Sequence, residues 1–233
     1  MFHCDIRLLK LRKIRGLTLQ TTLENSVTFS GVGLHSGILA NLTLKPAPVN
    51  HGILFKRLDI VLGNPLVRAR WDYVSDTTLS TRLKNEDGTM VSTVEHLMAA
   101  LAGCGVTNAL IELDSEEVPI LDGSAAPFVK GILEVGLNNI SSLSRIIKII
   151  KPVIFKSEFG WARLSPHQCP EMEYFIEFDD RAIGIQSKTL NMSNGSFVKE
   201  LSSSRTFCSS KDVETMRENG LALGGNYSNA LVF

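Results

Sequence analysis

The chain has 233 residues, 44% of them hydrophobic and 21% charged, which is the composition of a folded globular protein and excludes a disordered one. Its 24 Lys and Arg residues balance 24 Asp and Glu residues, so the overall charge gives no reason to expect nucleic acid as a partner. No apolar run approaches the length of a transmembrane helix. The four cysteines are far apart and form no CxxC pair, which indicates reduced thiols in a cytoplasmic protein.

Residues 1–16 form a basic extension in which Lys and Arg alternate with aliphatic residues. The segment lacks the uninterrupted apolar core and the small-residue cleavage site of a signal peptide. We therefore expect either a solvated extension of the first domain or a start codon placed upstream of the true one.

Short runs of alternating apolar and polar residues, separated by Gly, Pro and Asn, follow the extension. This two-residue period is typical of half-buried antiparallel strands. The predicted strands are residues 26–29, 38–44, 53–58 and 66–73.

The period changes at residues 91–101, where apolar residues recur at helical spacing and predict an amphipathic helix. The apolar run 109–113 predicts a buried strand. A second helix is predicted at residues 125–135, because the helical spacing returns there and Gly136 follows as a typical C-terminal stop.

The polar stretch 138–142 interrupts both periods with Asn and Ser residues that favour turns, and it therefore predicts a linker. The resulting expectation is an α+β protein with a first domain at 17–143 and a second domain at 144–233. In the second domain the same signals predict a hairpin of residues 146–155 and 161–164, a strand at 174–178, and helices at 197–201 and 211–219.

The segment 92–96 has two possible interpretations. In the first, Ser92 caps the helix and Glu95 reaches back to its amide, which is the capping-box pattern. In the second, His96 binds a metal and Glu95 beside it acts as a base, because zinc hydrolases combine an imidazole ligand with a carboxylate that accepts a proton. Glutamate next to histidine is a weak motif by itself, and the capping interpretation is the simpler one.

Three other segments carry polar groups without deciding a function. Residues 122–127 predict a turn that enters a helix, with Gly123 at positive φ. Residues 31–35 are rich in glycine but lack the lysine and the spacing of a phosphate-binding loop. Residues 203–207 supply hydroxyl groups and a guanidinium that would suit either a polar substrate or a capped loop.

Six segments stand out when the sequence is considered as a whole: Ser30–Gly37, Leu44–Pro48, Ser92–Gly103, Val118–Val129, Arg205–Phe207 and Gly220–Gly225. Together they resemble the UDP-3-O-acyl-N-acetylglucosamine deacetylase family, in which such segments occur in the same order. The resemblance extends over residues 20–233, which is nearly the whole chain except the basic extension.

The resemblance implies two similar layered α+β domains with the active site between them. It also implies removal of the N-acetyl group from a UDP-linked, 3-O-acylated glucosamine, with release of acetate, in lipid A biosynthesis. By position, His96 corresponds to a zinc ligand, Glu95 to the general base for the zinc-bound water, and Thr206 to a hydroxyl donor for the developing oxyanion. These roles are chemically consistent, because zinc polarises an amide carbonyl and a neutral donor helps to hold the negative charge that develops.

The resemblance further implies an apolar passage for the acyl chain, formed by an insert that includes residues 211–219. The same side chains would serve equally well in an ordinary core. The expected substrate-binding residues are Phe207, Val213, Met216 and Leu221.

The family's other zinc ligands, a histidine and an aspartate one helical turn apart, have no counterpart in this sequence, nor do its catalytic histidine and a substrate-binding lysine. A catalytic zinc takes about three protein ligands, so His96 alone does not hold the metal. We therefore expect a C-terminally truncated, monomeric deacetylase with an incomplete zinc site and no activity. The alternative is a non-catalytic remnant that at most binds the acylated nucleotide sugar.

Overall fold

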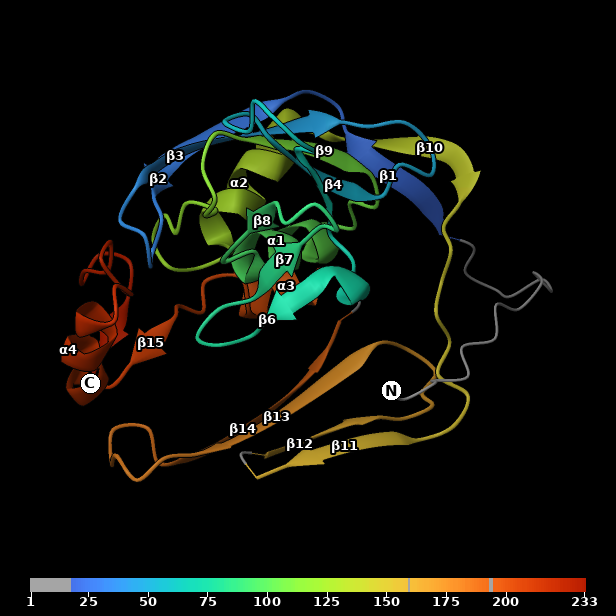
Figure 1. The fold of residues 1–233 in the computed structure, drawn as a ribbon. Helices are drawn as coiled ribbons and strands as arrows, with labels where there is room; N and C mark the ends of the chain where they lie inside the picture. The colour runs from blue at the N-terminus through green and yellow to red at the C-terminus, as the bar shows by residue number, and fades with distance from the viewer. Residues whose placement is uncertain (1–17, 159, 193–194) are drawn as a thin grey trace. The chain divides into compact units, whose positions relative to one another are not determined.

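The computed structural model describes every residue from 18 to 233 except 159, 193 and 194 (Figure 1). The described chain forms two compact units. The larger unit contains residues 20–142 and 195–233, and the smaller unit contains residues 143–192 with the short segment before residue 20. Helices and several sheets occur together, which confirms the predicted α+β class. The predicted domain boundary near residue 143 stays a prediction.

A five-stranded sheet forms the framework of the larger unit. Its second and third strands pair in antiparallel register, with Leu42 opposite Leu113, and within this sheet only the third and fourth strands are parallel. This confirms the strands predicted near residues 26–29, 38–44, 53–58 and 109–113. In spatial order the strands are β2 (Val27–Val32), β3 (Leu39–Pro46), β9 (Ala109–Leu113), β4 (Ile53–Arg57) and β5 (Leu66–Arg68).

One face of this sheet is buried along its central strands because apolar residues occupy alternate positions there. Leu42 and Ile111 on neighbouring strands are both inaccessible to solvent. Helices α1 (Glu95–Gly103) and α2 (Ala126–Val135) pack against this face (Figure 1). Phe128 of α2 lies edge-on to Phe29 of β2, with ring centroids 4.9 Å apart. Both helices were predicted from their apolar periodicity, and both are confirmed.

The predicted strand at residues 66–73 is only partly correct. The chain leaves the sheet after Arg68 and forms a 3-10 turn at Trp71–Tyr73, labelled η1. Arg70 stabilises this turn through an ion pair with Asp72 at 2.6 Å, and short-range contacts of this kind leave no trace in a two-residue period. A small three-stranded sheet follows, made of β6 (Val74–Asp76), β7 (Arg82–Lys84) and β8 (Met90–Val91).

The turns predicted at 138–142 are wrong, because these residues lie within strand β10 (Leu137–Leu143), whereas their role as a connection between two domains stays a prediction. Strand β10 pairs with β1 (Leu19–Leu23). The polar side chains that suggested a turn are used in this pairing instead, since Asn139 accepts a hydrogen bond from the Thr21 hydroxyl at 3.2 Å. Pairing with a second strand therefore outweighs the local turn preference of Asn and Ser.

The last segment of the chain belongs to the larger unit and holds four short elements. The predicted helix at 211–219 is confirmed, and Ser209 caps it by accepting a hydrogen bond from the Lys211 amide at 3.3 Å. The segment is anchored by Phe197, whose ring lies so close to Gly103 of α1 that any side chain at position 103 would overlap it. The elements are α3 (Ser196–Glu200), β15 (Phe207–Cys208), α4 (Ser210–Glu218) and β16 (Leu231–Val232).

The smaller unit consists of two antiparallel hairpins. The first joins β11 (Val153–Ser157) to β12 (Gly160–Leu164), which confirms the predicted hairpin with a shorter first strand. The second joins β13 (Glu171–Glu177) to β14 (Ile185–Asn191) and includes most of the strand predicted at 174–178.

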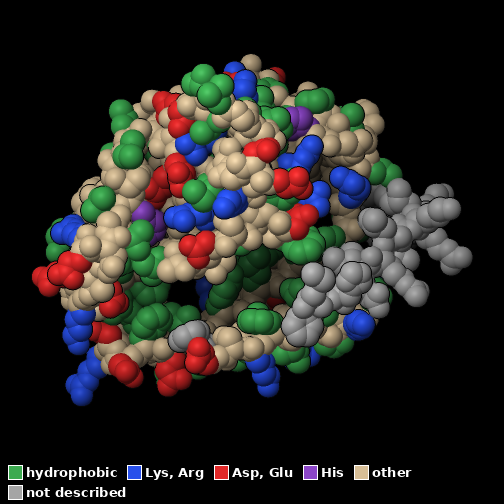
Figure 2. Space-filling view, viewed as in Figure 1, with side chains coloured by type: hydrophobic (Ala, Val, Ile, Leu, Met, Phe, Trp, Pro, Cys, Tyr) green, Lys and Arg blue, Asp and Glu red, His purple; other side chains and the backbone are tan. Residues whose placement is uncertain are grey.

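Charged side chains of both signs are interspersed over the visible face of the larger unit (Figure 2). The described residues of this face therefore present no extended basic surface. This distribution agrees with the balanced charge of the sequence, and neither feature favours nucleic acid as a partner.

Candidate active site

Glu95 and His96 occupy the first turn of α1, directly after an unusual turn in the backbone. Thr93 has a φ of +56°, which is rare for a β-branched residue. Ser92 does not cap the helix, because its hydroxyl accepts a hydrogen bond from Nε of Arg82 at 3.1 Å and the N-cap position is held by Val94, which has no side-chain cap. The Glu95 carboxylate accepts a hydrogen bond from the amide of Thr81 at 3.0 Å. The capping-box interpretation is therefore wrong, since the turn at Thr93 separates Ser92 from the helix.

His96 is mostly buried, and its Nδ1 atom is buried without a hydrogen-bond partner among the described residues. Burial lowers the pKa of the imidazole, whereas the charges of Glu95 and Asp122 act to raise it, and the net pKa lies below the ordinary value. The ring is therefore neutral at neutral pH. A neutral imidazole with a free nitrogen is the form that binds metal ions.

The turn that follows Leu121 connects this region to the segment carrying Thr206. The Thr206 amide donates to the carbonyl of Gly123 at 2.9 Å, and Nε of Arg205 donates to the carbonyl of Asp122 at 2.8 Å. Gly123 has a φ of +84°, and a side chain there would overlap the backbone carbonyl of Asn229. The predicted turn with a glycine at positive φ is confirmed. It brings the Thr206 backbone next to Asp122, whose charge acts on His96.

Two glycine-rich segments from opposite ends of the larger unit interlock beside Thr206. The amide of Leu223 donates to the carbonyl of His35 at 3.1 Å, and the amide of Gly224 donates to the carbonyl of Leu34 at 3.0 Å. A side chain on Gly224 would overlap the carbonyl of Gly33. The glycines near His35 thus permit a close approach of two backbones, which is a common reason for glycine in loops.

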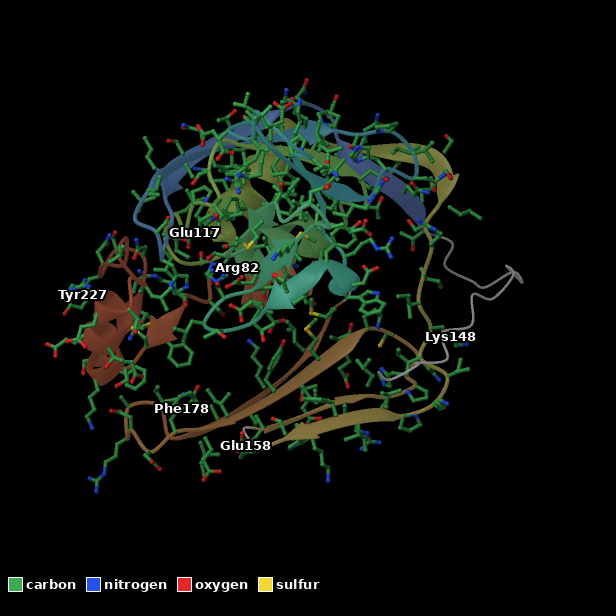
Figure 3. The ribbon with its side chains drawn as sticks, in the orientation of Figure 1. Arg82, Glu117, Lys148, Glu158, Phe178 and Tyr227 are labelled. Atoms are coloured by element: carbon green, nitrogen blue, oxygen red, sulfur yellow. The ribbon has the colours of Figure 1, made fainter. Side chains whose placement is uncertain are left out.

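A cavity of about 360 Å³ lies between these interlocked segments and α4. Of the expected substrate-binding residues, Phe207, Val213 and Met216 line it, and Leu221 does not. Thr206 also contributes to the wall, whereas Glu95 and His96 do not. Further lining residues are Leu34, His35, Leu79, Cys208, Ala222, Ala230 and Tyr227, the last labelled in Figure 3.

Comparison with known proteins identifies the family. A family model described as LpxC, UDP-3-O-acyl N-acetylglycosamine deacetylase, matches residues 20–233. The chain belongs to this deacetylase family. A UDP-3-O-acyl-N-acetylglucosamine deacetylase from Idiomarina loihiensis is 46% identical over 217 residues, which span 91% of this chain and 70% of the relative. Proteins of the same description from Colwellia psychrerythraea and Shewanella halifaxensis are each 44% identical over the same shares of the two chains.

In this member of the deacetylase family, helix α4 forms one wall of the cavity described above. This helix contains no fully buried residue, and its two apolar side chains Val213 and Met216 are half-buried where they line the cavity. A core helix would instead bury such side chains completely. This arrangement disfavours the alternative that these residues are ordinary core residues, while their role in substrate binding stays a prediction.

The described residues do not by themselves fit a zinc site. Among them, no group of three or more His, Cys, Asp or Glu side chains is arranged to hold a metal ion. A catalytic zinc in a deacetylase takes about three protein ligands and a water molecule. The unpaired nitrogen of His96 is one suitable donor, but one donor does not make a site.

The sequence analysis considered His35 only within the glycine-rich segment 31–35 and gave it no role, whereas in the structure it lines the cavity. It missed Thr81, which orients the Glu95 carboxylate, and Glu117, which accepts a hydrogen bond from the His35 amide. The glycines around His35 were the available signal. Thr81 and Glu117 act through contacts between distant segments, which no local pattern records.

Proposed function

We propose that this chain acts as a deacetylase on a UDP-linked, 3-O-acylated N-acetylglucosamine and releases acetate, as a step in lipid A biosynthesis. One observation carries the proposal: Thr206 lies in the wall of a cavity that combines apolar side chains, among them Val213 and Met216, with polar ones such as Ser210 and Arg217. An acyl chain needs an apolar cavity, and a reacting amide needs a polar group at its margin. A volume of about 360 Å³ is within the range of small-molecule sites, roughly 300–1,000 Å³.

The protein residues have separable tasks in this reaction. Glu95 takes a proton from the water that attacks the acetyl carbon, and the hydrogen bond from Thr81 fixes the orientation of its carboxylate. The Thr206 hydroxyl donates to the carbonyl oxygen as negative charge develops there. The proton then passes to the departing amine, which leaves the free amino sugar and acetate.

Zinc is part of the proposal as a cofactor that His96 helps to bind. When present, the metal would polarise the acetyl carbonyl and lower the pKa of a bound water to about 7. His96 suits this role because its imidazole is neutral and its Nδ1 atom has no partner among the described residues. A complete site requires about two more protein donors than these residues bring together.

A second candidate function is binding without turnover. The contrast between a formed cavity and an incomplete set of metal donors in the described residues favours it. In this case the chain binds the acylated nucleotide sugar and releases no acetate. The alternative differs from the deacetylase proposal only in the chemical step, so both share the same ligand.

The test combines three measurements on the purified 233-residue chain: zinc content, acetate release from the acylated UDP-sugar, and calorimetric binding of that sugar. Zinc near one equivalent together with acetate release supports the deacetylase, and Glu95→Gln should then abolish release without loss of zinc. Binding without zinc or acetate supports the second candidate. Absence of binding, zinc and turnover would contradict both.

We also infer a cytoplasmic location and a monomeric state. The described cysteines Cys104, Cys169 and Cys208 are free thiols, which is typical of proteins in a reducing compartment. None of the helices in the described part of the chain is long and apolar enough to cross a membrane. Analytical ultracentrifugation of the purified chain tests the monomeric state.

A further inference from the structure

Glu117 is a buried carboxylate in the segment between β9 and α2 (labelled in Figure 3). Its side chain is almost inaccessible, with 3% of its surface exposed. Oε1 accepts hydrogen bonds from the amide of His35 at 2.9 Å and from the hydroxyl of Thr93 at 2.7 Å, and Oε2 accepts one from the amide of Ser36 at 2.8 Å. All three donors are neutral groups. One carboxylate thus joins two segments that lie more than fifty residues apart in the sequence.

The hydrogen bonds keep Glu117 ionised in spite of its burial. Burial raises the pKa of this carboxyl group, but the donors from His35, Ser36 and Thr93 lower it by more, and the net pKa lies below the ordinary value. Hydrogen bonds to an ionised acceptor are stronger than those between neutral groups. The carboxylate therefore holds its donors more firmly than an amide side chain in the same place would.

Thr93 needs such a partner because its backbone is strained. A β-branched residue at a φ of +56° is stable only when its surroundings impose that conformation. The bond from its hydroxyl to Glu117 is the side-chain contact that holds the turn in this conformation, beside the backbone hydrogen bonds of Ser92 and Val94. Immediately after the turn, the amide of Val94 approaches the carbonyl of Thr81 at 3.4 Å, and the amide of Thr81 donates to Glu95. The conformation of Thr93 therefore sets where α1 begins and where the Glu95 carboxylate lies.

Gly33 shows that the same carboxylate also shapes the turn around His35. A Cβ atom at position 33 would lie 2.8 Å from Cδ of Glu117 and closer still to Oε2. Only glycine leaves room for the carboxylate, although the backbone at this position does not have a positive φ. Gly33, Ser36 and Glu117 therefore fit together as a set, which gives a physical reason for the glycine two residues before His35.

We propose that Glu117 is a positioning residue that fixes the Glu95 and His96 pair relative to His35. Its negative charge holds the strained turn at Thr93 on one side and the turn at His35 on the other. The consequence for catalysis rests on the proposed function. The evidence that Glu117 joins the two turns is independent of that function, because it consists of the hydrogen bonds from His35, Ser36 and Thr93 to the carboxylate.

The test is Glu117→Gln in the 233-residue chain, followed by two-dimensional NMR. Glutamine keeps the shape of the side chain but has only one oxygen to accept hydrogen bonds. We expect the amide signals of Thr81 and Glu95 and the ring signals of His96 to move, although the donors to the Glu117 carboxylate are other residues, His35, Ser36 and Thr93. Hydrogen exchange at the Thr81 amide should become about tenfold faster as its bond to Glu95 loosens. The control is Glu112→Gln, which removes a carboxylate that is paired with Lys45 on β3 and has no hydrogen bond to either turn.

Unchanged Thr81, Glu95 and His96 signals in a folded Glu117→Gln chain would overturn the proposal. A second pair of variants covers the case in which this chain does not fold. Thr93→Val replaces the hydroxyl by a methyl group and should move the same signals, while Thr93→Ser keeps the hydroxyl and should leave them near their wild-type positions. Equal spectra for the Val and Ser variants would also overturn the proposal. None of these measurements depends on turnover, so failure of the deacetylase assay leaves them valid.

Discussion

The amide of Thr206 donates a hydrogen bond to the carbonyl of Gly123 at 2.9 Å. This contact places the proposed oxyanion donor against the turn that enters α2. Gly123 has a φ of +84°, and a side chain there would overlap the carbonyl of Asn229. The position of Thr206 therefore depends on the absence of a side chain at Gly123, which lies 83 residues earlier in the chain.

Replacing Gly123 by alanine should accordingly lower the free energy of unfolding by more than the backbone strain alone would. We expect the left-handed backbone to cost about 1–2 kcal/mol and the overlap with Asn229 to cost about 2 kcal/mol more. The free energy of unfolding, measured by urea denaturation, checks this. The matched control is Gly105→Ala, because Gly105 has a φ of +78° but no atom within 4 Å of a Cβ. Equal losses in the two variants would show that the Asn229 contact is unimportant.

Replacing Gly33 by alanine should destabilise the protein partly through Glu117, because the new methyl group would collide with its carboxylate as well as with the Ser36 hydroxyl. A double-mutant cycle isolates this effect. We expect Gly33→Ala to cost less in a Glu117→Ala background, where the carboxylate is gone, with a coupling free energy of about 1–2 kcal/mol. Additive losses from the two substitutions would contradict the contact.

Much of the fold could be predicted from the sequence, because helices and buried strands record their environment in their periodicity. Helix α1, helix α2 and strand β9 all follow from the spacing of apolar residues. The predictions failed where a side-chain contact, and not the spacing of apolar residues, determines the local structure. Arg70 and Asp72 stabilise a turn in place of a strand, and Asn139 pairs with Thr21 in a strand in place of a predicted turn.

The candidate site was less predictable than the fold. Glu95, His96 and Thr206 gained their proposed roles from resemblance to a family, since the spacing of residues 92–96 equally allowed a capping box. The structure removes that alternative because Thr93 adopts a positive φ. Glu117 could not be found from the sequence, since its partners His35 and Thr93 lie 82 and 24 residues away.

The free energy of unfolding should depend on pH in the acid range, and Glu117 should account for part of this dependence. Its pKa is lower in the folded state than in the unfolded chain, so its contribution is fully present above the ordinary carboxyl pKa and is lost as the pH falls through the folded-state value. Glu117→Gln should lower the free energy of unfolding at neutral pH by about 2 kcal/mol and have a smaller effect in acid. Urea denaturation at several pH values checks this.

Other carboxyl groups with lowered pKa values, among them Glu112, act in the same direction. Glu112→Gln serves as the control, because this group is more exposed and its ion pairs with Lys45 and Lys56 are screened by solvent. We expect a smaller change in the acid dependence for this variant. A Glu117→Gln chain with the same acid dependence as the wild type would show that the carboxyl group titrates normally in the folded state.

Cys208 offers a direct probe of the cavity, because it lies in the wall next to Phe207. Burial raises the pKa of its thiol, and the charge of Asp212 raises it further, so little thiolate is present at neutral pH. We therefore expect slow alkylation by iodoacetamide, and slower alkylation still when the acylated UDP-sugar fills the cavity. Mass spectrometry of the alkylated chain measures both rates.

Cys104 provides the internal reference in the same experiment, since burial also raises its pKa but it does not line the cavity. The ligand should slow the alkylation of Cys208 while the rate at Cys104 stays constant. Met216→Asp places a charge in the apolar wall and should abolish this protection, because burying an unpaired carboxylate against an acyl chain is strongly unfavourable. Equal protection of both cysteines would indicate a global change in stability, and no protection of Cys208 would show that the acyl chain binds elsewhere.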